Sequence, residues 1–199
     1  FEGFLMRSSK TNELALLGET YVPGRVADVL ENMRIVEGAI GTQIAMLESD
    51  QADIALAFEP AVSIAEKQGY RVVYSMPELH GPFAFTGMNT TQELIDTKPT
   101  LVQDFVTGLE EAVQMIHRKP EKAIAVAQHV FPDLDRDVVE NAVLRMITSG
   151  TFPQHIAIPD QAWQALISIR LSVGDLKEPQ KTSVAVDNRF AETAQTILE

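Results

Sequence analysis

The sequence contains no cysteine, which excludes disulfide bonds, thiolate zinc sites and cysteine nucleophiles within these 199 residues. Basic residues are also few: 16 lysines and arginines stand against 28 acidic residues, for a formal net charge of −12. No cluster of basic residues is present that could neutralise a run of phosphates, so we expect no nucleic-acid partner. A small anion held by local dipoles remains compatible with this charge, because salt screens charges beyond about 8–10 Å.

Long apolar runs are missing as well. None reaches the roughly 18 residues of a membrane span, and the sequence opens on F-E-G-F-L-M-R rather than on a secretion signal. Two interpretations stay open: a cytoplasmic protein, or an exported one whose export segment is not part of this sequence. The four histidines are scattered, and G-x-S-x-G, H-E-x-x-H and P-loop patterns are absent. We therefore predict no metal, no cofactor and no catalytic residue.

The stretch from Ile44 to Pro60 carries the clearest pattern that is present. Apolar residues at helical spacing lead through a polar break into the nearly continuous apolar run of residues 54–58. Such a run is typical of a strand covered on both faces in a parallel sheet. Glu59 and Pro60 follow, where a new helix is expected to start. A Glu at a helix start complements the helix dipole whether or not it touches a ligand, and this structural role is the competing interpretation.

Two earlier segments repeat the order of strand, glycine turn and helix. Gly24 and Arg25 follow a predicted strand at 18–22, and Gly41 and Thr42 follow one at 34–37. Amide groups exposed at a helix start favour an anion, to which an arginine adds a bidentate contact. Ordinary turns, with Thr42 capping its helix, are the alternative. If the strands are parallel, all three turns lie at one edge of the sheet, and residues 18–75 form a small parallel α/β layer.

Further elements follow from the same patterns. Strands are predicted at 4–7, 70–75, 83–87 and 183–186, and the part of the chain beyond residue 98 is predicted to be mainly helical. A long helix starting at Pro99 places one apolar stripe on a face expected to be core: Leu101, Phe105, Leu109, Ala112, Val113 and Ile116.

Three motifs together resemble one protein family. They are the segment ending in A-D-I-A and E-P, the helix T-K-P-T-L-V-Q-D-F-V-T-G-L-E-E-A at 97–112, and V-D-N-R-F at 186–190. Their order and spacing are similar to those of the NMT1-like substrate-binding proteins of bacterial ABC importers, which handle nitrate, sulfonates, taurine and pyrimidine precursors of thiamine. The resemblance covers roughly residues 40–199.

The resemblance implies an α/β fold of the type II periplasmic-binding-protein class with two lobes. Residues 1–80 would form an α/β lobe whose amino-terminal part is truncated, and residues 81–199 a crossover strand plus the helical part of the second lobe. Tyr74 and His80 would then lie near the cleft. A fragment of this kind would expose apolar helix faces, and self-association would be one way to bury them.

The function implied is that of a periplasmic or membrane-associated solute-binding protein that performs no chemistry. Its partners would be a membrane permease and a small polar or anionic ligand: a sulfonate, nitrate, a carboxylate or a pyrimidine. Two alternatives stay open. One is an enzyme of the same fold, similar to a synthase of the thiamine pyrimidine precursor, although such enzymes rely on a cysteine-rich stretch that is absent here. The other is a cytoplasmic effector-sensing domain.

Overall fold

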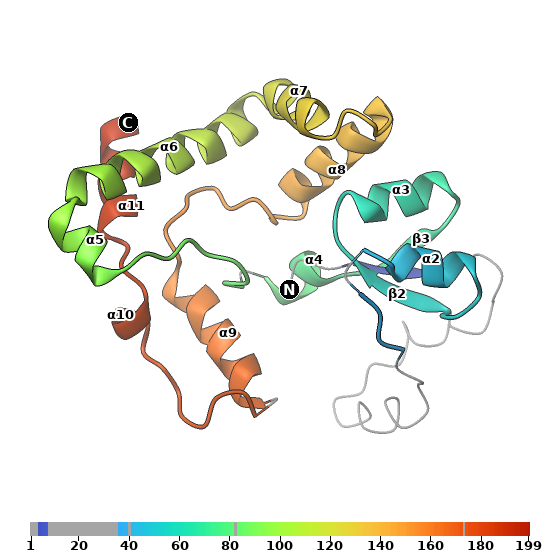
Figure 1. Cartoon of the computed structure of the whole chain (residues 1–199), viewed down its shortest axis with the longest axis horizontal. Coiled ribbons are helices and arrows are strands. Elements are labelled where there is room, and N and C mark those ends of the chain that lie inside the picture. The colour runs from blue at the N-terminus through green and yellow to red at the C-terminus, as the bar shows by residue number, and fades with distance from the viewer. Residues whose placement is uncertain (1–3, 8–35, 40, 82, 173) are drawn as a thin grey trace. The chain divides into compact units, whose positions relative to one another are not determined.

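The computed structural model of the chain divides into two compact units, with the division after Ser75 (Figure 1). It describes residues 4–7, 36–39, 41–81, 83–172 and 174–199. The elements of the smaller unit are β1 (Phe4–Arg7), α2 (Gln43–Glu48), β2 (Ile54–Ala57), α3 (Ala61–Lys67) and β3 (Arg71–Ser75). Those of the larger unit are α4 (Met76–His80), α5 (Gln92–Thr97), α6 (Pro99–Arg118), α7 (Pro120–Val130), α8 (Arg136–Thr148), α9 (Asp160–Ser172), α10 (Thr182–Ala185) and α11 (Arg189–Leu198).

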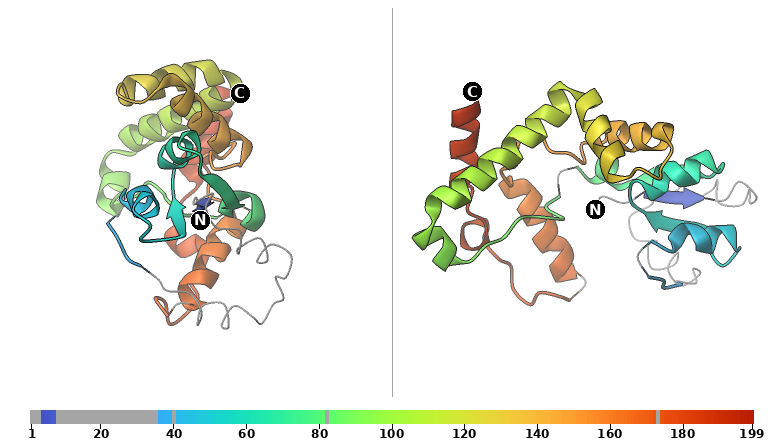
Figure 2. Two further views of the ribbon diagram at one scale, coloured as in Figure 1. Left: turned by 90° about the vertical axis from the view of Figure 1, so that its right-hand side faces the viewer. Right: turned by 45° about the horizontal axis from the view of Figure 1, so that its top comes forward.

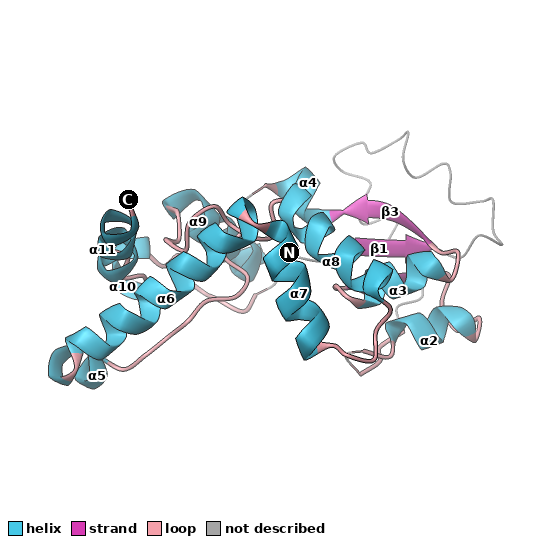
Figure 3. Ribbon diagram, turned by 90° about the horizontal axis from the view of Figure 1, so that it is seen from above, coloured by secondary structure: helices cyan, strands magenta, loops and turns pink. Residues whose placement is uncertain are grey.

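The sheet of the smaller unit has the strand order β2-β1-β3, and β1 pairs antiparallel with both neighbours. Figure 3 shows β1 beside β3. The β2-α3-β3 segment runs as predicted, with its two strands parallel to each other. The prediction of a purely parallel layer is wrong, however, because the crossover leaves a gap between β2 and β3 that β1 fills in the opposite direction. A strand is also predicted at 34–37, but its described residues, 36 and 37, form no strand.

The core of this unit lies on one face of the sheet. Ala55 and Ala57 of β2 are buried against α2 and α3, together with Leu47, Val62 and Ala65. The intervening Leu56, by contrast, is 36% exposed. The prediction of a strand covered on both faces is therefore wrong. Alanines face the helices because small side chains allow close packing, and the apolar run concealed an ordinary alternation of buried and open positions.

The larger unit is helical, as predicted for the part of the chain beyond residue 98. Helix α11 packs across α6, and α7 packs against α8 (Figure 2). The predicted strand at 183–186 is wrong, because Thr182–Ala185 form the short helix α10. The strand predicted at 83–87 is also wrong: in this segment Ala84 donates one backbone hydrogen bond to Ala162 without forming a ladder.

The long helix α6 begins with Pro99 at its first turn, as predicted. Its expected apolar stripe is only partly covered, since Leu101 and Phe105 are 54% and 51% exposed. The buried residues of α6 are Val102 and Glu110. A fully buried carboxylate on this helix was not predicted.

Candidate functional site

One edge of the small sheet brings together the ends of β2 and β3. Phe4, the first residue of β1, pairs with Ala57 of β2 on one side and with Ser75 of β3 on the other. The carboxyl ends of β2 and β3 therefore flank the start of β1. Ligands of open α/β sheets bind outside the carboxyl ends of the strands, so we take this edge as the candidate site.

Glu59 lies at this edge, between the end of β2 and the start of α3. Its Oε2 accepts a hydrogen bond from the backbone N–H of Ser63 at 3.1 Å, and its Oε1 accepts from the Ser63 hydroxyl at 3.1 Å. Glu59 thus satisfies a free amide of the first turn of α3, which is the structural role set against ligand binding above. The carboxylate of Glu59 is an acceptor group, and its two bonds to Ser63 hold it in place at the start of α3.

Gly41 and Thr42 precede α2, which runs antiparallel to β2 and so starts toward the same edge (Figure 1). Gly41 has φ +95°, a conformation that suits glycine, and its N–H donates to Gln43 Oε1 at 2.8 Å. The alternative in which the side chain of Thr42 caps the helix is wrong, because that side chain makes no capping hydrogen bond. Its hydroxyl instead donates to the Ala39 carbonyl oxygen at 2.8 Å.

The other predicted site residues are placed as follows. Pro60 is the first residue before α3 and is joined to Glu59 by a cis peptide bond. Tyr74 lies in β3, paired with Leu5 of β1 and half-buried, one residue from the edge. His80 ends α4, in the larger unit. Gly24 and Arg25 lie outside the described residues.

Ser75 is a polar residue of this edge that the sequence did not single out. It is 8% exposed, and its hydroxyl has no hydrogen-bond partner among the described residues. A buried hydroxyl without a partner is uncommon, because a buried polar group that makes no hydrogen bond costs about 1–3 kcal/mol of stability. The only signal in the sequence is a serine directly after the apolar and aromatic strand residues.

Among the described residues at this edge, the carboxylate of Glu59 supplies negative charge, and the other polar groups are neutral hydrogen-bonding groups. Glu59 supplies a carboxylate, and Arg71 lies at the opposite end of the sheet, where it pairs with Arg7. Helices α2 and α3 have only six and seven residues, so their dipoles are small. Within the described residues no group of three or more acidic or histidine side chains could hold a metal ion.

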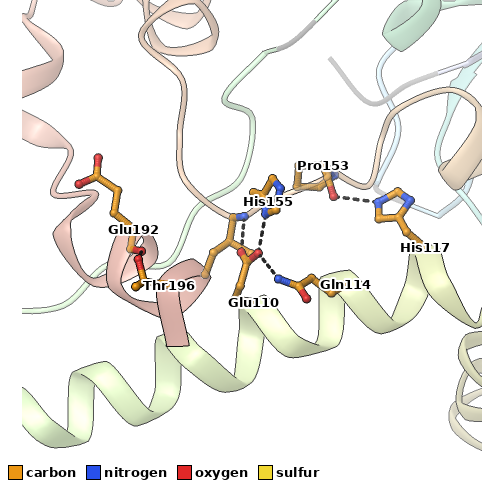
Figure 4. Close-up of polar contacts among 8 residues, drawn as sticks. Glu110, Gln114, His117, Pro153, His155, Glu192 and Thr196 are labelled. Carbon is orange, nitrogen blue, oxygen red and sulfur yellow. Dashed lines mark hydrogen bonds and ion pairs between the residues drawn. The ribbon is translucent and has the colours of Figure 1, made fainter. Parts of the chain in front are cut away.

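A second polar cluster lies in the larger unit, around Glu110 of α6 (Figure 4). Its side chain has no exposed surface, and it accepts hydrogen bonds from His155 Nδ1 at 2.6 Å, Gln114 Nε2 at 2.9 Å and the Ile156 N–H at 3.0 Å. Burial raises the pKa of Glu110, but the three hydrogen bonds and the charge of His155 outweigh burial and leave this pKa below its ordinary value.

This cluster fixes the segment between α8 and α9. Asn188 adds a second attachment, because its side-chain amide both accepts from the Ile158 N–H at 3.0 Å and donates to the Ile158 carbonyl oxygen at 2.9 Å. In the structure, the asparagine of V-D-N-R-F therefore holds the segment to the start of α11. The cluster is a structural fastening, and no ligand role is assigned to it.

Comparison with known proteins gives one match. The model of the family described as "NMT1/THI5 like" matches residues 30–123, somewhat less than half of the chain. The match confirms the resemblance drawn from the sequence, and the family has the type II periplasmic-binding-protein fold. No curated protein and no solved structure gives a significant match. Within the described residues, no helix is long and apolar enough to cross a membrane.

Proposed function

We propose that this chain is the solute-binding component of an ABC importer, because residues 30–123 match the NMT1/THI5-like family model. In this proposal it holds a small molecule in a cleft between two lobes and delivers it, chemically unchanged, to a membrane permease. The family match is the observation that carries the proposal. It also supports an extracytoplasmic location, which is typical of the family.

The geometry of the smaller unit supports a binding role. The carboxyl ends of β2 and β3 lie on either side of the start of β1, and Glu59 and Ser75 lie at or within two residues of these ends. Tyr74 precedes Ser75 in β3, so its side chain lies on the opposite face of the sheet. A site of this kind needs a few convergent polar groups rather than a reactive nucleophile. Together these groups offer acceptors and hydroxyl donors.

The charge at this edge narrows the ligand class. Glu59 presents a carboxylate, so the edge favours a ligand that carries an N–H donor or an ammonium group. An aminopyrimidine and an aminosulfonate such as taurine both carry one, whereas nitrate does not. We therefore propose a donor-bearing ligand, whose acceptor or anionic end is held by other groups of the cleft.

A thermal and calorimetric screen tests the proposal. Taurine, 4-aminopyrimidine, acetate and nitrate would each be added to the protein, and unfolding and heat of binding would be measured. A ligand present at a hundred times its dissociation constant stabilises by about 2.7 kcal/mol. We expect stabilisation by at least one donor-bearing compound and none by nitrate. Mass spectrometry of the recovered ligand would show it unchanged; an altered compound would favour the synthase alternative.

The variant Glu59→Gln makes the screen specific to this edge. It should weaken binding of the donor-bearing ligand by about 1.5–3 kcal/mol, the range for a hydrogen bond to a charged group. Glu48→Gln is the matched control, because Glu48 is an exposed carboxylate at the far end of α2. Equal affinities of the parent protein and Glu59→Gln would leave Glu59 with its helix-start role alone.

A further inference from the structure

The segment between α8 and α9 crosses the larger unit without secondary structure of its own. We call residues 151–158 of this segment the strap. Its sequence is T-F-P-Q-H-I-A-I, so His155 is the one ionisable side chain that it carries. Polar contacts attach the strap to α6 through Glu110 and His117, and to the start of α11 through Asn188 (Figure 4).

The contact between His155 and Glu110 depends on a proton at one atom. Nδ1 of His155 lies 2.6 Å from Oε1 of Glu110, and a carboxylate can only accept, so Nδ1 must carry hydrogen. The imidazolium form always does. A neutral imidazole does so only in one of its two tautomers, and in the other it turns a lone pair toward the carboxylate.

Glu110 needs a donor at His155 Nδ1 because its carboxylate has no exposed surface and so no water to bond instead. A buried charge is costly unless it is paired and hydrogen-bonded. Gln114 and the Ile156 N–H supply two neutral donors, and His155 is the partner that can also supply a positive charge. Loss of that charge leaves the buried carboxylate with neutral donors only.

His117 makes a contact of a different kind. Its Nε2 lies 2.9 Å from the Pro153 carbonyl oxygen, which only accepts, so Nε2 is the donor. Its Nδ1 faces the side-chain NH₂ of Gln154 at 3.4 Å and therefore suits the neutral ring. The bond from His117 Nε2 to the Pro153 carbonyl oxygen is kept in both charge states of the ring. The contact of Nδ1 with Gln154, which also belongs to the strap, needs the neutral ring, so protonation of His117 would act on the strap in the opposite direction to protonation of His155.

We propose that the strap is a proton-controlled fastening: protonated His155 holds it against Glu110, and loss of that proton loosens residues 151–158 from α6. Histidine is the side chain that ordinarily changes charge between pH 5 and 8. The strap also leads into α9 and is bound to Asn188. Its loosening would therefore weaken the links among α6, α9 and α11.

Among the described ionisable groups near Glu110, His155 is the one whose protonation strengthens the attachment of the strap. On α6, Glu111 follows Glu110 in the sequence and is exposed, and His117 lies farther along the helix. On α11, Glu192 points away from Glu110 (Figure 4). His155 is the charged group that acts electrostatically on Glu110.

Hydrogen exchange of the Ile156 amide tests the proposal directly, because this amide donates to Glu110. Protection would be measured at pH 6 and pH 8 and divided by the intrinsic exchange rate at each pH. We expect protection to fall about three- to tenfold, corresponding to the difference between a charged and a neutral hydrogen bond. The lower bound reflects solvent screening, since the His155 side chain is 53% exposed.

Two variants locate the effect. His155→Gln should abolish the pH dependence at Ile156, because glutamine donates without titrating. His129→Gln, an exposed histidine of α7, should retain it. Equal protection of the parent protein at both pH values would overturn the proposal, and so would a fall that persists in His155→Gln. Should His155→Gln not fold, NMR titration of the parent protein decides: the Ile156 amide and the His155 ring must titrate together.

Discussion

Replacing Glu110 by glutamine tests whether the buried carboxylate holds the larger unit together. The substitution keeps the size of the side chain but removes its charge and turns one acceptor oxygen into a donor NH₂. At least one of the three donors, from Gln114, His155 and Ile156, then loses its acceptor. The variant should therefore unfold more readily than the parent protein.

The expected size follows from the burial of the two partners. Removing one member of a buried ion pair costs about 3–5 kcal/mol. His155 is 53% exposed, so solvent recovers part of its loss. We therefore expect Glu110→Gln to lower the free energy of unfolding at pH 7 by about 2–3 kcal/mol.

Urea denaturation followed by tryptophan fluorescence measures this change. The single tryptophan, Trp163, lies in α9 of the same unit, where its Nε1 donates to the Gln180 carbonyl oxygen at 3.2 Å. Glu111→Gln is the control, because its side chain is exposed on the same helix and surface substitutions cost within about 0.5 kcal/mol. If Glu110→Gln costs no more than this control at an unchanged denaturant slope, the reasoning about the buried carboxylate is refuted.

Three further predictions concern stability. Folding lowers the pKa of Glu110 from its ordinary value of 4.5, so its contribution to stability is complete above pH 4.5 and is lost as the pH falls through the lower pKa of the folded protein. The difference in stability between the parent protein and Glu110→Gln should therefore shrink as the pH falls below 4.5, and a constant difference would contradict this. Asn188→Ala should lower the free energy of unfolding, measured by urea denaturation, by about 1–3 kcal/mol, because the backbone of Ile158 loses two hydrogen bonds. Asn141→Ala, at an exposed position, should lower it little, and equal effects of the two variants would contradict the attachment of the strap through Asn188. Ala57→Leu should lower the free energy of unfolding by about 1–3 kcal/mol through overpacking, which thermal unfolding detects as a lower midpoint. Truncating the partly open Leu56 should lower the midpoint less, and the reverse order would contradict the assignment of faces in β2.

The sequence predicted those elements whose signals are local. Strand β3 is marked by β-branched and aromatic residues, and α6 by Pro99 and a long helical period, and both are present. The position of β1 could not be predicted, because strand order depends on contacts between Phe4 and residues more than fifty positions away. The segment at 183–186 was too short for its period to separate helix from strand.

The candidate site was predictable only in part, for the same reason. Glu59 was found from a local pattern, and its partner Ser63 lies one helical turn away, at a spacing that the sequence displays. Glu110 and His155 are 45 positions apart, so their pairing leaves no local signal. A glutamate between the apolar residues Leu109 and Val113 was the available clue, and the amphipathic pattern of α6 concealed it.

Isothermal titration calorimetry with taurine and 4-aminopyrimidine, on the parent protein and on Glu59→Gln, tests the proposed solute-binding function most directly. We expect saturable binding of at least one compound to the parent protein, weakened about 10- to 150-fold by Glu59→Gln and unchanged by Glu48→Gln. Absence of binding by any donor-bearing compound, with tight binding of nitrate instead, would contradict it.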